Sequence, residues 1–340
     1  MRAFTYQSAG SAQAAVGGTS DKPGSSDKRG DGATVFLAGG TTLLDLMKLD
    51  VSRPAALIDI GEATQQLSVI EATAAGLRIG ALAKMSAVAN DTAVNRDYPV
   101  VAQSLQMAAS AQLRNMASMA GNLLQRTRCS YFRDTTWARC NKRVPGSGCD
   151  ALEGMNRLHG VLAVSEQCIA SYPGDFANVF VALDGSVEVL GPRGARTIRA
   201  ANLHLASGDS PAVETTLHPG ELITALYIPS GPHTRRSAYV KVRDRQSYAF
   251  ALTSAAVAMD LQGGTVRDVR IGLGGVAGKP WRSAEAEAVL RGQPFSEALA
   301  SRAGEAAFAR ARTREHNAFK PQLGALTLVR ALMQVHGMEV

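Results

Sequence analysis

The chain has 340 residues, of which 46% are hydrophobic and 19% charged, and its formal net charge is +7. This composition is typical of a globular protein of about two domains, because domains commonly contain ~100–200 residues. No apolar run reaches the ~18 residues of a membrane-spanning helix. The opening residues, MRAFTYQSAG, lack an apolar core, so we expect no secretory signal here. The charge fits an anionic cofactor or an acidic protein partner, and no basic stripe interleaved with aromatics indicates single-strand binding.

The first informative stretch in chain order is TVFLAGGTTLLDLMK, residues 34–48. Its first four residues predict a buried strand, Gly39 and Gly40 break that strand, and Thr41 and Thr42 begin a helix. Such a turn lets backbone N–H groups approach a phosphate closely. A plain strand-to-helix connection has the same pattern, and neither a P-loop nor a Rossmann fingerprint is present.

A second candidate is ASAQLRNMASMAGNLL, residues 109–124, which a helix predicted from about Pro99 enters. Small residues crowd its end: Ala117, Ser118, Ala120 and Gly121. They would let the backbone pack closely against either a flat ring or another helix. The residues alone leave both interpretations open.

All four cysteines follow, with the spacing C-x10-C-x8-C-x18-C: Cys129, Cys140, Cys149 and Cys168. Two disulfides would suit a small secreted domain, and zinc sites usually contain C-x2-C pairs. Four thiolates can also hold a [4Fe–4S] cluster. Nearby cations would offset its negative charge: Arg126, Arg128, Arg133, Arg139, Lys142 and Arg143. Four unrelated buried thiols remain the alternative.

Six segments together resemble the FAD-binding subunit of the molybdenum hydroxylases, the xanthine dehydrogenase and carbon monoxide dehydrogenase flavoprotein family. They are AGGTTLLDLMK, QLRNMASMAGNL, GDFANVFVALDGSVEV, GELITALYIP, YVKVRDRQSYAFALTSAAVAM and VRIGLGGVAGKPWRSAEAEAVLRG. The resemblance covers nearly the whole chain. Within the family, it is strongest to the flavin subunit of periplasmic-type, three-subunit aldehyde oxidoreductases. The inserted loop of that subgroup binds a [4Fe–4S] cluster, which implies that the four cysteines are its ligands.

The resemblance implies an α+β fold in two parts. Residues 1–222 would be a two-subdomain FAD-binding domain of the molybdenum-hydroxylase flavoprotein type, with the cluster loop inserted at about 125–168. Residues 229–334 would be a C-terminal α+β domain, a three-stranded sheet with helices. The chain departs from the family at residues 16–33, VGGTSDKPGSSDKRGDGA, which we expect to be a surface loop. It also has Ala120 where the family has a second glycine.

The resemblance further implies which residues contact the cofactor. The loop that would hold the FAD pyrophosphate through its N–H groups is Leu37, Ala38, Gly39, Gly40, Thr41, Thr42, Leu43 and Leu44. The residues expected around the flavin ring and ribityl chain are Ala109, Ala117, Gly121, Asn122 and Leu123. Asp175 would bind the adenosine side, Leu222 and Ile223 would pack on the flavin, and Lys241 would lie near it. Helix capping explains Asp175 equally well, core packing explains the two aliphatic residues, and a solvated position explains the lysine.

The implied function is electron transfer, with no catalytic residue on this chain. Aldehyde oxidation would occur at the molybdenum cofactor of a large partner, and electrons would pass through [2Fe–2S] clusters of a small partner to the FAD. The complex would be a heterotrimer without nucleic acid or membrane insertion. It would be exported folded to the periplasm with a partner's twin-arginine signal, or remain in the cytoplasm.

The expected acceptor is ferredoxin, attracted by the basic loop, and NAD⁺ reduction of the xanthine dehydrogenase type is the alternative. Two other classes remain open at this point. One is a stand-alone flavin oxidase, and the other is an iron–sulfur or nucleic-acid-binding protein without flavin.

Overall fold

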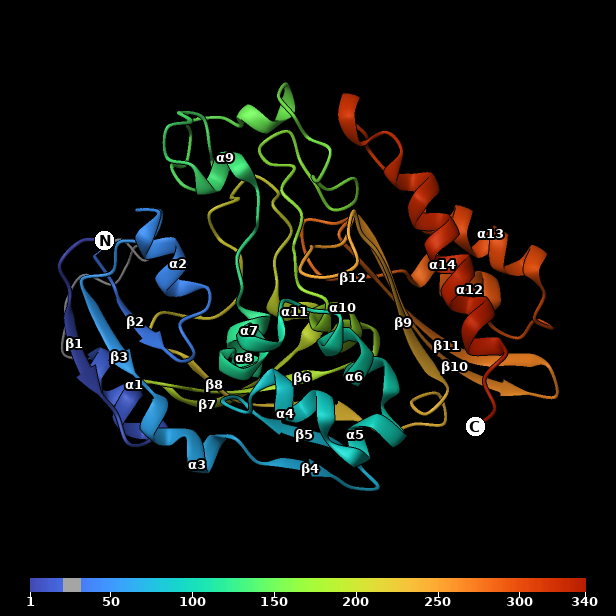
Figure 1. Ribbon diagram of the computed structural model, residues 1–340, viewed down its shortest axis with the longest axis horizontal. Helices are drawn as coiled ribbons and strands as arrows, with labels where there is room; N and C mark the ends of the chain where they lie inside the picture. The colour runs from blue at the N-terminus through green and yellow to red at the C-terminus, as the bar shows by residue number, and fades with distance from the viewer. Residues whose placement is uncertain (21–31) are drawn as a thin grey trace.

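The computed structural model describes residues 1–20 and 32–340, and these residues form three sheets (Figure 1). The N-terminal sheet is parallel, with the order β1-β3-β2. Its strands are β1 (Thr5–Ser8), β2 (Thr34–Leu37) and β3 (Ala56–Asp59), and its helices are α1 (Ala12–Ser20) and α2 (Leu43–Lys48). The predicted order of strand, glycine turn and helix in residues 34–48 is therefore confirmed, but β2 is only partly buried and the helix begins at Leu43, one residue after Thr42.

The loop expected at residues 16–33 is wrong at its start, because α1 continues to Ser20. Ala15 and Val16 on this helix pack against Ile58 in a small core, so the alanine-rich segment before the insertion has a buried face. The central part of that expected loop, residues 21–31, lies outside the described residues.

The middle sheet has five antiparallel strands in the order β4-β5-β8-β6-β7. The strands are β4 (Ile70–Ala72), β5 (Gly76–Gly80), β6 (Ser186–Gly191), β7 (Gly194–Arg199) and β8 (Leu222–Pro229). The helices associated with this part of the chain are η1 (Gly61–Ala63), α3 (Thr64–Leu67), α4 (Met85–Asn90), α5 (Thr92–Asp97), α6 (Pro99–Gln106), α7 (Ala111–Met116), α8 (Met119–Leu123), α10 (Phe176–Ala182) and α11 (Ala200–Leu203). Because β8 pairs with β5 and β6, the segment 222–229 belongs to this sheet.

The single helix expected from Pro99 through residues 109–124 is instead three short helices, α6, α7 and α8. Ala109 adopts a φ of 49° between the first two, a left-handed conformation that ends a right-handed helix. Ala117 and Ser118 are extended between the second and third, and the Ser118 hydroxyl caps α8 by accepting from Gly121 N. At the second break the chain lies directly against Gly39, in the turn that follows β2.

The C-terminal domain contains the expected three strands and a two-residue fourth, in the order β12-β11-β10-β9. The strands are β9 (Ser237–Val242), β10 (Thr253–Gln262), β11 (Thr265–Gly274) and β12 (Trp281–Arg282). The helices are α12 (Ala284–Leu290), α13 (Glu297–Phe308), η3 (Glu315–Asn317) and α14 (Lys320–His336). Helix α14 packs on the sheet through residues at helical spacing: Leu328, Ala331, Leu332 and Val335. Helices α6 and α10 also contact this sheet, so the two domains share an interface.

The segment between α8 and α10 contains little regular structure beyond α9 (Ser130–Arg133) and η2 (Asp150–Leu152). Figure 1 shows it standing above the sheets, between α2 on one side and the C-terminal helices on the other. None of the helices in the described part of the chain is long and apolar enough to cross a membrane.

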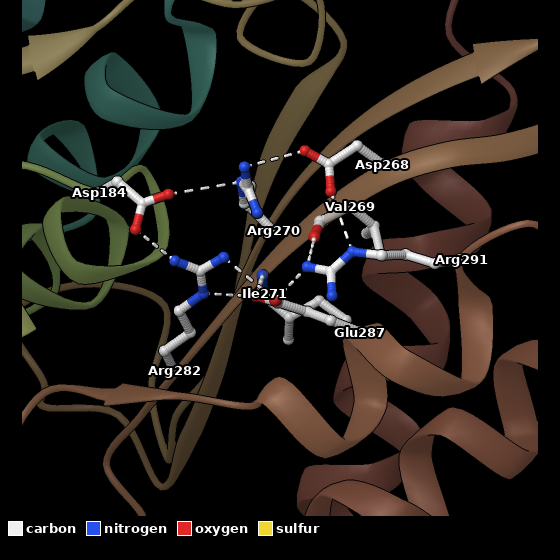
Figure 2. A network of polar contacts seen from close by, with 8 residues as sticks. All are labelled: Asp184, Asp268, Val269, Arg270, Ile271, Arg282, Glu287 and Arg291. Carbon is white, nitrogen blue, oxygen red and sulfur yellow. Dashed lines mark hydrogen bonds and ion pairs between the residues drawn. The ribbon is translucent and has the colours of Figure 1, made fainter.

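A network of charged side chains joins the end of α10 to the C-terminal sheet (Figure 2). Asp184 accepts from Arg282 and lies 3.6 Å from the Arg270 Nε. Glu287, whose side chain is 2% exposed, accepts from Arg282 at 2.8 Å, from Arg291 at 2.6 Å and from the Ile271 N–H at 3.0 Å. The buried carboxylate therefore binds helix α12 to strands β11 and β12.

We predict that Glu287→Ala lowers the free energy of unfolding by about 3 kcal/mol, because removing one member of a buried ion network leaves its partners uncompensated. The control is Glu285→Ala on the same helix. Its exposed side chain lies 4.0 Å from Arg310, and we expect a change within about 0.5 kcal/mol. Chemical denaturation of both variants tests this, and equal midpoints would contradict it.

Candidate cofactor site

A cavity of about 920 Å³ lies between the N-terminal sheet, helix α8 and the segments that follow it. This volume is at the upper end of the ~300–1,000 Å³ range of small-molecule sites. One wall is the turn after β2, from Ala38 to Leu43, and a second wall is formed by Ser118, Gly121 and Leu123. The remaining walls come from residues 125–127, 170–172, 204–205 and 212–220.

The two glycines of the β2–α2 turn are required by the geometry of the first wall. A Cβ on Gly39 would lie 2.0 Å from the Met116 carbonyl oxygen, which real atoms do not tolerate. Gly40 has a φ of 71°, which favours glycine. The turn therefore packs directly on the chain between α7 and α8, and residues of both walls line the cavity.

Two buried side chains fix the end of α8. The Tyr172 hydroxyl donates to the Leu123 carbonyl at 2.8 Å, and His204 Nε2 lies 2.8 Å from the same oxygen. Burial lowers the pKa of His204 to about 4, so its ring is neutral and donates from Nε2. Next to this carbonyl, the Asn122 Oδ1 is buried without a hydrogen-bond partner among the described residues. A donor from a bound molecule would satisfy that oxygen.

An ion triad closes the cavity on the side of the cysteines. Glu214 accepts from Arg126 and, at 2.9 Å, from Lys142, and the lysine also donates to the Pro211 carbonyl at 3.0 Å. Burial raises the pKa of Glu214, but the two cations outweigh this effect and hold it below its usual value. The triad therefore presents a fixed charge pattern at the cavity wall.

The structure brings together part of the expected FAD site. Of the expected residues, those that line the cavity are Ala38, Gly39, Gly40, Thr41, Thr42, Leu43, Gly121 and Leu123. Leu37 ends β2, and the Leu44 side chain packs beneath Gly40. Ala109 lies in the turn before α7, and Ala117 lies between the two walls. Leu222 and Ile223 belong to strand β8, where both are buried in hydrophobic cores.

Asp175 and Lys241 bind each other instead of lining the cavity. The Lys241 Nζ lies 2.8 Å from the Asp175 Oδ2, with side chains only 1% and 5% exposed, and the Tyr239 hydroxyl donates to Oδ1 at 2.7 Å. Burial raises the pKa of Asp175, and the lysine opposes that shift. Asp175 precedes α10 without a side-chain capping bond, and Lys241 is not solvated. In the described structure the pair joins the two domains.

Sequence reasoning missed a large part of the cavity wall. Residues 204–205 and 212–220 come from the connection between α11 and β8, and residues 170–172 come from the end of the cysteine segment. The aromatic and acidic side chains there, Tyr172, His204 and Glu214, have no motif that would single them out. Only the fold places them beside the glycine turn.

The four cysteines line a second, much smaller cavity of about 10 Å³: Cys129, Cys140, Cys149 and Cys168. The backbones of Cys140 and Cys149 pair as an isolated antiparallel β-bridge, and the backbones of Cys168 and Ser165 form a second one. All four are free thiols. Within residues 1–20 and 32–340, no group of three or more His, Cys, Asp or Glu side chains is arranged to hold a metal ion.

The thiols differ in acidity. Burial raises the pKa of Cys129 to about 12 and also raises that of Cys140. The contact between Cys149 and Cys168 raises the pKa of Cys149 and lowers the pKa of Cys168, and the charge of Lys142 also lowers the pKa of Cys168. A cation bound in the cavity would favour deprotonation of Cys129 and Cys140, whose pKa values burial raises.

The cations around the cysteines point inward rather than forming a surface patch. Arg133 binds Asp45, at 2.8 Å, and Lys142 is 7% exposed in its bond to Glu214. Arg143 donates to backbone carbonyls of the same segment, including that of Tyr131 at 2.6 Å. Among the six cations of this segment, Arg139 alone is exposed by more than half, at 52%.

Comparisons with known proteins identify the family. The family model described as "FAD binding domain in molybdopterin dehydrogenase" matches residues 2–231, and "CO dehydrogenase flavoprotein C-terminal domain" matches residues 237–335. The chain therefore belongs to the FAD-binding flavoproteins of the molybdenum hydroxylase family, which confirms the resemblance. The first match contains every residue of the large cavity wall except Gly278.

Individual relatives agree with this assignment. The chain is 45% identical, over 98% of both chains, to the aldehyde oxidoreductase FAD-binding subunit PaoB of Escherichia coli K12. It is 28% identical to the nicotine 6-hydroxylase medium subunit of Paenarthrobacter nicotinovorans, over 80% of this chain and 77% of that protein. The fold matches reconstituted CO dehydrogenase from Oligotropha carboxidovorans with a TM-score of 0.75, 23% identity and 99% coverage of both chains. The expected α+β fold is confirmed.

The large cavity fits FAD on three observations. Its volume accommodates a dinucleotide-sized ligand, the glycine turn from Ala38 to Leu43 lines it, and the Asn122 Oδ1 lacks a partner among the described residues. The turn is the part of the wall where a pyrophosphate would approach the backbone most closely.

We predict that Gly39→Ala weakens FAD binding at least about tenfold, a loss of roughly 1.4 kcal/mol, because the new Cβ separates the two walls and FAD is then lost on desalting. The control is Gly17→Ala in α1, where a Cβ meets nothing within 4 Å. Flavin absorbance after desalting, together with circular dichroism, measures occupancy and folding. Equal flavin content in the two folded variants would show that the contact is not needed.

Proposed function

We propose that this chain is the FAD- and [4Fe–4S]-containing electron-transfer subunit of a molybdenum-dependent aldehyde oxidoreductase. It receives electrons from [2Fe–2S] clusters of a small partner and passes them through FAD to an external acceptor. A large partner with the molybdenum cofactor oxidises the aldehyde, and the three chains form a heterotrimer. The full-length 45% identity to an aldehyde oxidoreductase FAD-binding subunit carries this proposal.

The chain's own residues would bind and orient the cofactor. The turn from Ala38 to Leu43 would hold the pyrophosphate, and Gly121, Asn122 and Leu123 would contact the flavin side. When bound, FAD supplies the redox chemistry. Tyr172 and His204 would keep the Leu123 carbonyl fixed, and the carboxylate of Glu214 would remain ionised between its two cations.

The donor set of the small cavity supports the cluster. Four thiols from a span of forty residues face one another, and a [4Fe–4S] cluster takes four cysteine thiolates, one on each iron. The four thiolates of such a cluster each bind a different iron, so they surround the cluster instead of converging on a single metal ion. The cavity of about 10 Å³ requires the thiol side chains to turn outward when a cluster is inside. The nearby Lys142 would offset part of the cluster's negative charge.

The two cavities share a wall, which supports a cluster on the electron path. Lys142 and Ala170 line both of them. The Ala170 N–H lies 3.5 Å from the Cys168 Sγ, so two residues of backbone join a cysteine to the cavity proposed for FAD. Electrons could therefore move between the two centres within this chain.

We predict that Cys→Ser at position 129, 140, 149 or 168 removes iron and keeps FAD, because the thiols face their own cavity. The control, Ser130→Ala, changes an exposed side chain next to Cys129 and should keep both. Iron analysis and flavin absorbance of the assembled complex measure the two cofactors. Full iron content in all four variants would contradict the cluster assignment.

The acceptor is proposed to be ferredoxin, although the inward orientation of Arg133 and Lys142 removes them as a docking patch. We predict that the assembled enzyme reduces ferredoxin or an artificial dye with aldehyde as donor and does not reduce NAD⁺. Stopped-flow reduction assays compare the acceptors. Rapid NAD⁺ reduction would instead support the xanthine dehydrogenase-type alternative.

The periplasm is the proposed compartment, with a twin-arginine signal on a partner chain. Fractionation of cells that express all three chains tests this point separately from activity.

A flavin-free preparation that still carries iron would support the rival class of a non-flavin iron–sulfur protein.

A further inference from the structure

A buried histidine outside the expected site contacts one of the four cysteines. His159 Nε2 lies 3.1 Å from the Cys129 Sγ, and the histidine is 5% exposed. Its other ring nitrogen, Nδ1, is buried without a hydrogen-bond partner among the described residues. The ring also lies against Tyr131, with centroids 6.0 Å apart. The sequence has no motif around this histidine.

The backbone of His159 is held from two directions. Its N–H donates to the Asn156 carbonyl at 2.9 Å, and its carbonyl accepts from the Lys320 Nζ at 2.9 Å. The lysine is fully buried at the start of α14 and donates its second bond to the Gly275 carbonyl at 2.8 Å. The C-terminal domain therefore holds the backbone of a residue whose side chain contacts Cys129.

Two further contacts hold the same stretch of chain. The Asn156 Oδ1 accepts from the backbone N–H of His316 at 3.1 Å, and Asn317 Nδ2 donates to the Gly160 carbonyl at 3.3 Å. Residues 156–160 are thus bound to η3 and α14 along their length. Movement of the backbone at residue 159 away from Cys129 would require these bonds to break.

The chemistry of the pair defines which group donates. A cysteine that binds iron is a thiolate and carries no proton, so it can only accept a hydrogen bond. A neutral imidazole has one N–H, and the Nε2 tautomer places that proton on the sulfur. The partnerless Nδ1 is then the unprotonated nitrogen, which leaves no buried N–H without an acceptor.

We infer that His159 is a positioning residue that donates its Nε2–H to the Cys129 thiolate and raises the reduction potential of the cluster that the cysteines hold. This inference depends on the proposed cluster. A reduced cluster carries one more negative charge than the oxidised one, so a donor to a ligand sulfur stabilises the reduced form more strongly.

Redox titration of the assembled complex, followed by the electron paramagnetic resonance signal of the cluster, tests this role. In His159→Leu, which has no donor, we expect the ratio of reduced to oxidised cluster at the wild-type midpoint to fall about tenfold, or about 59 mV for a one-electron couple. In His159→Gln, which keeps an N–H, we expect a midpoint between those of wild type and His159→Leu. A merely structural role would leave the midpoint unchanged.

The control is His336→Leu, at the other end of α14, where the ring stacks on Phe295 at 4.4 Å. It should keep the wild-type midpoint. A second measurement needs no variant: with ¹⁵N-labelled histidine, the reduced wild-type cluster should show a weak ¹⁵N coupling through the hydrogen bond.

The outcomes separate the inference from the function on which it rests. If the wild-type complex contains iron but both His159 variants keep the wild-type midpoint, the inference is overturned and the cluster stays in place. The same holds if the wild-type cluster shows no ¹⁵N coupling. Wild-type complex that contains FAD but no iron overturns both the cluster assignment and the role of His159.

Discussion

The ion pair between Lys142 and Glu214 stands in the wall between the two cavities, and both sites depend on it. The lysine belongs to the cysteine segment and lines both cavities, whereas the glutamate comes from the connection that leads into β8. Arg126 adds a second cation to the same carboxylate. Without the carboxylate, two cations would face each other at a half-buried wall, which is unfavourable in a medium of low dielectric. The pair therefore fixes the cysteine segment on the FAD-binding domain.

The cysteine segment is bound equally firmly on its other side. Lys320, from the first turn of α14, donates two bonds to carbonyls of different segments, and no carboxylate is among its described hydrogen-bond partners. Burial lowers its pKa to about 7. Since a buried ammonium is unfavourable unless its donors are satisfied, the lysine constrains the two loops that it joins. An irregular segment of about forty residues obtains its rigidity from both domains rather than from its own secondary structure.

The sequence predicted features that depend on local chemistry. The β2–α2 turn follows from Gly39 and Gly40, and the two-domain α+β fold follows from a resemblance that spans nearly the whole chain. The prediction from the sequence was wrong where the backbone departs from the conformation that its residues favour. Ala109 adopts a positive φ that alanine rarely takes, and this break splits one expected helix. No local pattern distinguishes that alanine from its neighbours.

The rest could not be predicted because it arises from long-range pairs. Arg133 and Lys142 look like solvated cations in the sequence, but Asp45 and Glu214, each more than seventy residues away, turn them inward. Asp175 and Lys241, which the resemblance places near the cofactor, form a buried ion pair with each other, and neither lines the large cavity.

An electron-transfer subunit requires fixed distances and a fixed electrostatic environment more than it requires reactive side chains, because its cofactors supply the redox chemistry. The described structure is consistent with that requirement. Glu214 and Tyr172 in the wall of the large cavity are paired, and Lys320 holds the cysteine segment from the other side. Such networks leave little freedom for charges to reorganise when an electron arrives.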